Sequence, residues 1–174
     1  MKVLGPRGIY EWVIARTRYI DAVFVRAASA GFVQVLVLGA GFDSRAIRFH
    51  SELGRAKVFE MDAATTQTAK IKQYRKRRIA IPGNLHFVSI NFEKESIEQK
   101  LQQAGFSMGA KTLALTEGVV QYLAPEAAYR TLGTIASCVG QGSWLVFDYA
   151  HASSVKGPLE SKDRQEVTSR LARY

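Results

Sequence analysis

A glycine turn in the first quarter of the sequence has the residue types of a ligand-binding loop. Gly39 and Gly41 follow the apolar run 35–38 and precede Asp43 and Ser44. Glycine adopts backbone angles that other residues avoid, and it lets a ligand approach the main chain. Asp43 or Ser44 can cap a helix that begins at this point. The pattern predicts a strand, a tight turn and a helix that together hold a nucleotide-like cofactor.

A second apolar run, 58–62, ends in the carboxylate of Asp62 one helix later. Residues at the ends of parallel strands point into the binding crevice of an open α/β sheet, and a carboxylate there accepts from both ribose hydroxyls. Glu60 lies on the same strand face two residues earlier and could share that role. The alternative for Glu60 is a buried acid paired with an arginine.

The glycine turn differs from the dinucleotide fingerprint G-x-G-x-x-G/A, because Ser44 occupies the third position. Asp43 would also face a pyrophosphate with like charge at a helix N-terminus, which normally attracts anions. A ligand with a cationic sulfonium and an amino-acid head suits the turn better. We therefore expect S-adenosyl-L-methionine as the cofactor.

Four sequence segments occur in a specific order along the chain. They are ARTRYID at 15–21, LGAGFDSRAIR at 38–48, FEMD at 59–62 and TEGVVQYL at 116–123. In these segments, and over residues 16–149 as a whole, the chain resembles the leucine carboxyl methyltransferase family, including its bacterial S-adenosylmethionine-dependent members. The resemblance implies a Rossmann-like class I methyltransferase.

The resemblance also implies which residues contact the methionine, ribose and adenine parts of the cofactor. Gly39 and Gly41 would line the methionine part of the cofactor, and Asp62 would bind the ribose. Asn91 and Phe92 match the position where an acid and an apolar residue meet the adenine, although the acid is an amide here. An amide accepts a weaker hydrogen bond than a carboxylate, so we expect weaker affinity for the cofactor. Asn91 could equally cap the next helix.

Two charged residues would contact the amino-acid end of the cofactor. By resemblance, Glu117 neutralises its ammonium group, and Arg16 pairs with the carboxylate of the cofactor or of the substrate. The alternative for Glu117 is a favourable charge at the N-terminus of the next helix. Tyr19 and Tyr122 could border the acceptor pocket, although helix packing explains each equally well. No residue is assigned as catalytic.

Alternating apolar runs and chain breakers predict a doubly wound, mainly parallel α/β sheet. The expected strands are 33–38, 57–61, 84–90, 112–116 and 143–149. The expected helices are 8–30, 44–53, 64–78, 94–104 and 126–139. We expect one methyltransferase domain over 1–174, with an N-terminal helical lid at 1–31, a Rossmann-like core at 32–150 and a partial C-terminal segment at 151–174.

The sequence ends soon after the fifth expected strand, whereas the resemblance implies a further closing pair of strands. We therefore expect a domain without that pair, as a fragment or a short member. Strand 143–149 would then be an exposed edge that invites pairing with another chain, and so a homo-oligomer. A truncated, catalytically inactive remnant of the family is an alternative reading.

The composition limits the class of protein only broadly. The 174 residues are 47% hydrophobic, which is ordinary for one soluble domain. No stretch is long and apolar enough for a membrane span, and the first residues make a poor signal peptide, so we expect a cytoplasmic protein without membrane partners. The single Cys138 is expected to be buried and inert. The three histidines are scattered without the spacing of metal ligands, so we expect no metal site.

The net charge of +9 comes partly from a basic run at 70–78. We interpret this run as the solvated face and end of a helix, where basic residues complement the helix dipole. Tyr74 is its only aromatic residue. Single-strand binders interleave aromatic residues with basic ones, so the run disfavours a nucleic-acid partner. Nucleic-acid binding through this run is kept as an alternative function.

The expected activity is methylation by S-adenosyl-L-methionine of an oxygen in a carboxylate or hydroxyl group. The acceptor would be a small molecule or the carboxyl terminus of a peptide. An ionised carboxylate needs no general base, whereas an alcohol needs one, and no residue in the sequence is a convincing base. The enzyme would then act mainly through positioning and a dry site.

Overall fold

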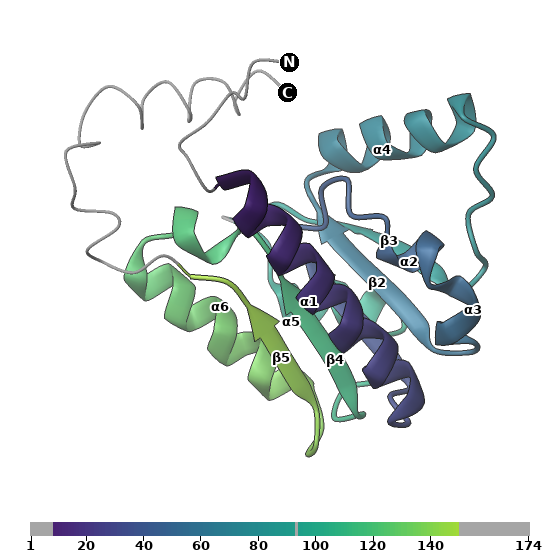
Figure 1. Ribbon diagram of the computed structural model, residues 1–174. Coiled ribbons are helices and arrows are strands. Elements are labelled where there is room, and N and C mark those ends of the chain that lie inside the picture. Colours follow the sequence, from purple (N-terminus) through teal and green to yellow (C-terminus); the bar gives the residue numbers. More distant parts are fainter. Residues whose placement is uncertain (1–8, 93, 150–174) are drawn as a thin grey trace, which may run out of the picture.

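The computed structural model describes residues 9–92 and 94–149, which form one parallel sheet with helices on both faces (Figure 1). The strands are β1 (Gln34–Leu38), β2 (Lys57–Asp62), β3 (Leu85–Ser89), β4 (Thr112–Thr116) and β5 (Trp144–Phe147). Their order across the sheet is β3-β2-β1-β4-β5. This arrangement confirms the doubly wound α/β fold expected from the sequence.

The helices cover both faces of this sheet. They are α1 (Ile9–Ser29), α2 (Arg45–Arg48), α3 (His50–Leu53), α4 (Ala64–Lys76), α5 (Ile97–Gln103) and α6 (Pro125–Cys138), with a 3-10 turn η1 (Val120–Tyr122) between β4 and α6. In Figure 1, α1 crosses one face of the sheet while α5 and α6 lie behind it.

Two hydrophobic cores form because successive side chains of a strand point to opposite faces. In β1, Val35 and Val37 join the core beneath α1, α2 and α3. Leu36 and Leu38 join the core beneath α5 and α6. All of β1 is buried, as expected for the central strand of a parallel sheet. Cys138 ends α6 fully buried, and burial raises the pKa of its thiol.

Three helices differ from the sequence expectation at their boundaries. The expected helix 44–53 is divided into α2 and α3 at Phe49, which leaves helical geometry and packs its ring 5.9 Å from Phe24. Helix α5 begins only after Ser96, whose hydroxyl accepts a hydrogen bond from the backbone of Gln99. Helix α4 ends early because Arg78 adopts a left-handed φ of 55°.

Strand β5 forms the edge of the sheet in the part of the chain that the structure describes. Its side chains Trp144, Leu145 and Phe147 are each more than a third exposed. Pairing of this edge with another chain stays a prediction, and the expected C-terminal segment 151–174 lies outside the described residues. Among the described helices, none has the length and apolarity to cross a membrane.

Candidate cofactor site

At the carboxyl edge of the sheet, four residues at the ends of β1, β2, β4 and β5, or directly after them, lie in line. The last row of paired residues is Leu38, Met61, Thr116 and Phe147. The residues directly after this row are Gly39, Asp62, Glu117 and Asp148. Parallel strands therefore bring one glycine and three carboxylates, from distant parts of the sequence, to one edge.

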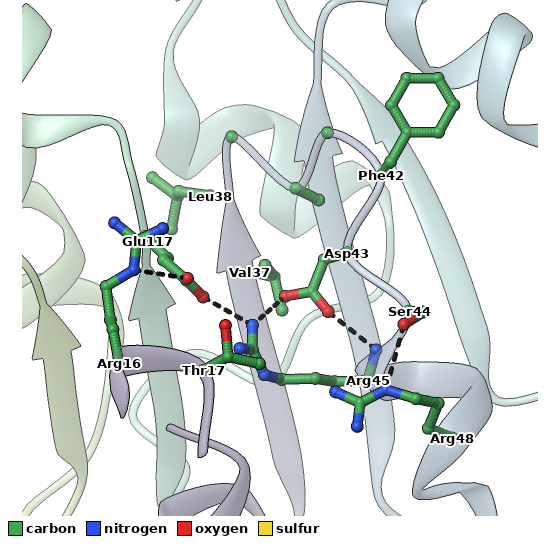
Figure 2. Close-up of a pocket in the computed structure, with 13 residues that line it drawn as sticks. Arg16, Thr17, Val37, Leu38, Phe42, Asp43, Ser44, Arg45, Arg48 and Glu117 are labelled. Atoms are coloured by element: carbon green, nitrogen blue, oxygen red, sulfur yellow. Dashed lines mark hydrogen bonds and ion pairs between the residues drawn. The ribbon is translucent and has the colours of Figure 1, made fainter. Parts of the chain in front are cut away.

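A cavity of about 340 Å³ lies between the glycine loop, α1 and the end of β4 (Figure 2). Four of the predicted cofactor residues line it: Arg16, Gly39, Gly41 and Glu117. The other three, Asp62, Asn91 and Phe92, are not among its lining residues. The structure thus brings together the residues predicted for the amino-acid end of the cofactor, whereas those predicted for adenosine lie along the edge toward β3.

The glycine loop depends on conformations that side chains resist. Gly39 and Gly41 have φ values of +62° and +46°, in the left-handed region. A Cβ at Gly39 would also overlap the γ-methyl group of Val119. Asp62 closes the loop from the neighbouring strand, since its carboxylate accepts a hydrogen bond from the backbone N–H of Gly41 at 2.6 Å.

Asp43 caps the short helix α2 after the glycine loop. The sequence offers Asp43 and Ser44 as the two possible caps. The carboxylate of Asp43 accepts from the backbone N–H of Arg45 at 2.7 Å, whereas the side chain of Ser44 makes no capping bond. The hydroxyl of Tyr74 donates to the carbonyl of Asp43 at 3.3 Å. The loop is therefore held from α4 as well as from β2.

An ion-pair network surrounds Glu117 at the end of β4. One carboxylate oxygen lies 2.8 Å from Nε of Arg16, and the other accepts from Nη1 of Arg45 at 2.7 Å. Nη1 of Arg16 also donates to Asp148 at 2.5 Å, and Asp148 accepts from the backbone N–H of Gly118 at 2.7 Å. Arginines from two helices therefore converge on acids from two strand ends.

Arg45 and Asp148 are members of this network that the sequence reasoning did not select. A usable signal existed for Asp148, because it directly follows an apolar strand, as Asp62 and Glu117 do. No comparable signal marks Arg45, since an arginine in the first turn of a helix is commonly a surface residue.

Arg16 has an unsatisfied donor beside the cavity. Its Nε is close to Glu117, but the N–H is not directed at the carboxylate, and this buried donor has no hydrogen-bond partner in the described chain. The guanidinium also stacks 4.3 Å from the ring centre of Trp12. The buried Nε is not accessible to a ligand. Arg16 nevertheless lines the cavity, so the rest of its guanidinium suits an anionic group there.

Glu60 does not reach the cavity. It is 1% exposed, and its carboxylate accepts from Nζ of Lys70 at 2.6 Å. The alternative of a buried, paired acid is therefore the better description, with a lysine as the partner instead of an arginine. Lys70 is itself 1% exposed, so the interpretation of the basic run as a solvated face is wrong for this residue. The run's other basic residues, Lys72, Arg75, Lys76, Arg77 and Arg78, are exposed.

Asn91 and Phe92 are exposed beyond the end of β3. The backbone N–H of Asn91 donates to the carboxylate of Glu95 at 2.7 Å, and its carbonyl accepts from the backbone N–H groups of Lys94 and Glu95. The main chain of Asn91 thus organises the turn before α5. Its proposed contact with adenine stays a prediction.

The two tyrosines suggested for the acceptor pocket are not explained by packing. Tyr19 and Tyr122 are each 64% exposed, so the alternative of helix packing does not account for them. Phe42 is 60% exposed, and in Figure 2 its ring points away from the charged cluster.

The sheet order, the glycine loop and the acids at the strand ends define a Rossmann-like class I methyltransferase fold. A sequence profile of the leucine carboxyl methyltransferase family matches residues 2–136. The chain belongs to this family. It is 34% identical over 155 residues to a Bacillus subtilis protein named "Putative S-adenosyl-L-methionine-dependent methyltransferase YktD", covering 83% of this chain and 50% of that protein. The chain spans about half the length of the curated relatives it matches.

Solved structures support the fold. Magnesium protoporphyrin IX methyltransferase from Synechocystis, solved with bound S-adenosylmethionine, superposes with a TM-score of 0.57 at 14% identity, covering 85% of this chain and 66% of that chain. An O-methyltransferase family protein from Burkholderia thailandensis gives 0.59 at 16% identity, covering 83% and 42%. At these identities the likeness concerns the fold alone.

The charges around the cavity suit a cationic ligand. Five carboxylates lie in or beside the network, against three arginines, so the edge is locally negative although the chain as a whole carries +9. The carboxylates are Asp21, Asp43, Asp62, Glu117 and Asp148. A sulfonium and an ammonium group gain from this excess, whereas a pyrophosphate is repelled. The residues present therefore fit S-adenosyl-L-methionine.

Proposed function

We propose that this chain binds S-adenosyl-L-methionine over the loop at 39–41 and methylates an oxygen of a carboxylate or hydroxyl group. The observation that carries the proposal is the pairing of Arg16 with Glu117 beside the loop cavity. One cation and one anion at the same wall match the two charges of an amino-acid head group. The family membership of the chain supports the same cofactor.

Each residue of the site has a separate task in this proposal. Arg16 binds the carboxylate of the cofactor, and Glu117 binds its ammonium group. Gly39 and Gly41 let the main chain approach the ligand, while Asp62 binds the ribose hydroxyls in addition to the loop. Bound S-adenosyl-L-methionine supplies an electrophilic methyl group. The protein contributes orientation and exclusion of water, which account for several kcal/mol of such barriers.

The lack of a free base among the described lining residues favours a carboxylate over a hydroxyl as the methyl acceptor. The described lining of the cavity contains no histidine, lysine, cysteine or tyrosine, and its acids Asp43 and Glu117 are both paired with Arg45. A hydroxyl acceptor requires a base to remove its proton, whereas a carboxylate is ionised near neutral pH. We therefore propose a small carboxylic acid or a peptide carboxyl terminus as the acceptor.

Transfer of a radiolabelled methyl group tests the proposed activity. The purified chain is incubated with labelled S-adenosyl-L-methionine and pooled carboxylic acids, or with matched primary alcohols. We expect label in the acid pool that mild alkali releases as methanol, because esters hydrolyse and ethers do not. Label that survives alkali would contradict the carboxylate acceptor. Cofactor binding without any transfer would favour the reading as an inactive remnant.

A further inference from the structure

Arg45 is a buried cation that joins three elements of the site. It is 4% exposed, and its guanidinium contacts a carboxylate from each element. These are Asp21 of α1 at 2.8 Å, Asp43 of the glycine loop at 2.6 Å and Glu117 after β4 at 2.7 Å. In Figure 2 the Arg45 side chain lies between Asp43 and Glu117.

The two arginines at Glu117 have different surroundings. Arg16 is 19% exposed and lines the cavity, so its guanidinium can meet an anionic group of a ligand. Arg45 directs Nε and Nη1 at carboxylates of the protein itself. Its contacts therefore act on the groups that form the wall of the cavity.

We infer that Arg45 is a positioning residue, which holds Asp43 and Glu117 in the orientation that binds the amino-acid end of S-adenosyl-L-methionine. This inference rests on the proposed function. Without the cation, Asp43 and Glu117 would stand as unbridged like charges on neighbouring loops and would turn apart. The ammonium group of the cofactor would then meet a displaced carboxylate.

The planar fork of arginine is required for this task. A guanidinium carries five N–H donors in fixed directions, and Arg45 uses them toward three different elements. A lysine ammonium keeps the charge, but it is a compact group on a flexible stem and cannot hold all three carboxylates at these separations.

The test compares two ligands that differ at the amino-acid end. S-adenosyl-L-methionine carries this end, and 5′-methylthioadenosine lacks it. Calorimetric titration of Arg45→Gln is expected to show at least tenfold weaker binding of S-adenosyl-L-methionine and less than twofold change for 5′-methylthioadenosine. Arg45→Lys, which retains the charge, guards against a failure of the first variant to fold and is expected to show the same selective loss.

Arg75→Gln is the control. Arg75 is an exposed residue of α4 and does not line the cavity. We expect no selective loss in this variant. Equal weakening of both ligands in the Arg45 variants, or full affinity in Arg45→Lys, would overturn the positioning role alone. Failure of the unmodified chain to bind either ligand would overturn the proposed function together with it.

Discussion

The carboxylate of Asp62 accepts a hydrogen bond from the backbone N–H of Gly41 across 2.6 Å. This contact joins the end of β2 to the glycine loop that follows β1. The second carboxylate oxygen of Asp62 accepts from the backbone N–H of Ala63 at 2.6 Å. The carboxylate proposed to bind the ribose therefore also fixes the loop that we propose lies under the cofactor.

Replacing Asp62 is expected to damage both the loop and the ribose contact. We predict that Asp62→Ala weakens S-adenosyl-L-methionine binding at least tenfold, which corresponds to about 1.4 kcal/mol. Asp62→Asn keeps one oxygen acceptor for Gly41, so its loss should be smaller. Calorimetric titration of the two variants measures the difference, and wild-type affinity in Asp62→Ala would contradict this role.

The two loop glycines are expected to differ in their tolerance of a methyl group. Both have positive φ, so alanine at either position costs about 1–2 kcal/mol of backbone strain. Only at Gly39 would the new Cβ overlap Val119, whereas at Gly41 it would meet the carbonyl oxygen of Gly39 at an ordinary contact distance of 3.9 Å. Gly39→Ala should therefore lower the free energy of unfolding more than Gly41→Ala in urea titrations. A partial recovery in Gly39→Ala combined with Val119→Ala would identify the overlap as the cause, and equal losses would exclude it.

Removal of Lys70 is expected to leave the buried Glu60 without its partner. At pH 8, Lys70→Met should lower the free energy of unfolding by about 3 kcal/mol, because the buried Glu60 loses its partner and must either stay charged without it or take up a proton. Lys72→Met is the control on the same helix, and it should change stability by less than about 0.5 kcal/mol because Lys72 is exposed. Equal losses of unfolding free energy in the two variants, measured by chemical denaturation, would contradict this account.

Stability is expected to depend on pH through Glu60. Burial raises its pKa to about 7, although Lys70 acts in the opposite direction. Between an ordinary value of 4.5 and about 7, the native state holds a proton that the unfolded chain has released. The free energy of unfolding therefore falls as pH rises through this window and then levels off.

Glu60→Gln removes this titration. From pH 5 to pH 8 the wild type should lose of the order of 2 kcal/mol relative to the variant, measured by urea unfolding. A wild type that keeps or gains stability relative to Glu60→Gln from pH 5 to pH 8 would show that Glu60 does not take up a proton in the native state.

The sequence predicts the fold well because its strands are short, apolar and punctuated by glycine. The run before Gly39 and the acid-tipped run ending in Asp62 are local patterns, and the sheet register places their ends side by side. Helix boundaries are less predictable, as Phe49 shows. Its contact with Phe24 in α1 is tertiary, and no local rule indicates that a helix is interrupted there.

The charged interior was less accessible to sequence reasoning. Lys70 belongs to a run of basic residues, and only the fold shows that this one turns inward to Glu60. Arg45 forms ion pairs with Asp21 and Glu117, which are far away in the chain. Such pairings depend on which helix covers which strand end, so composition and spacing do not reveal them.

Calorimetric titration of the purified 174-residue chain with S-adenosyl-L-methionine tests the central claim most directly. The account predicts saturable binding, at least tenfold weaker binding by Glu117→Gln and unchanged binding by Arg75→Gln, an exposed control on α4. A folded chain that binds no S-adenosyl-L-methionine, or a Glu117→Gln variant that binds it as the wild type does, would contradict the account.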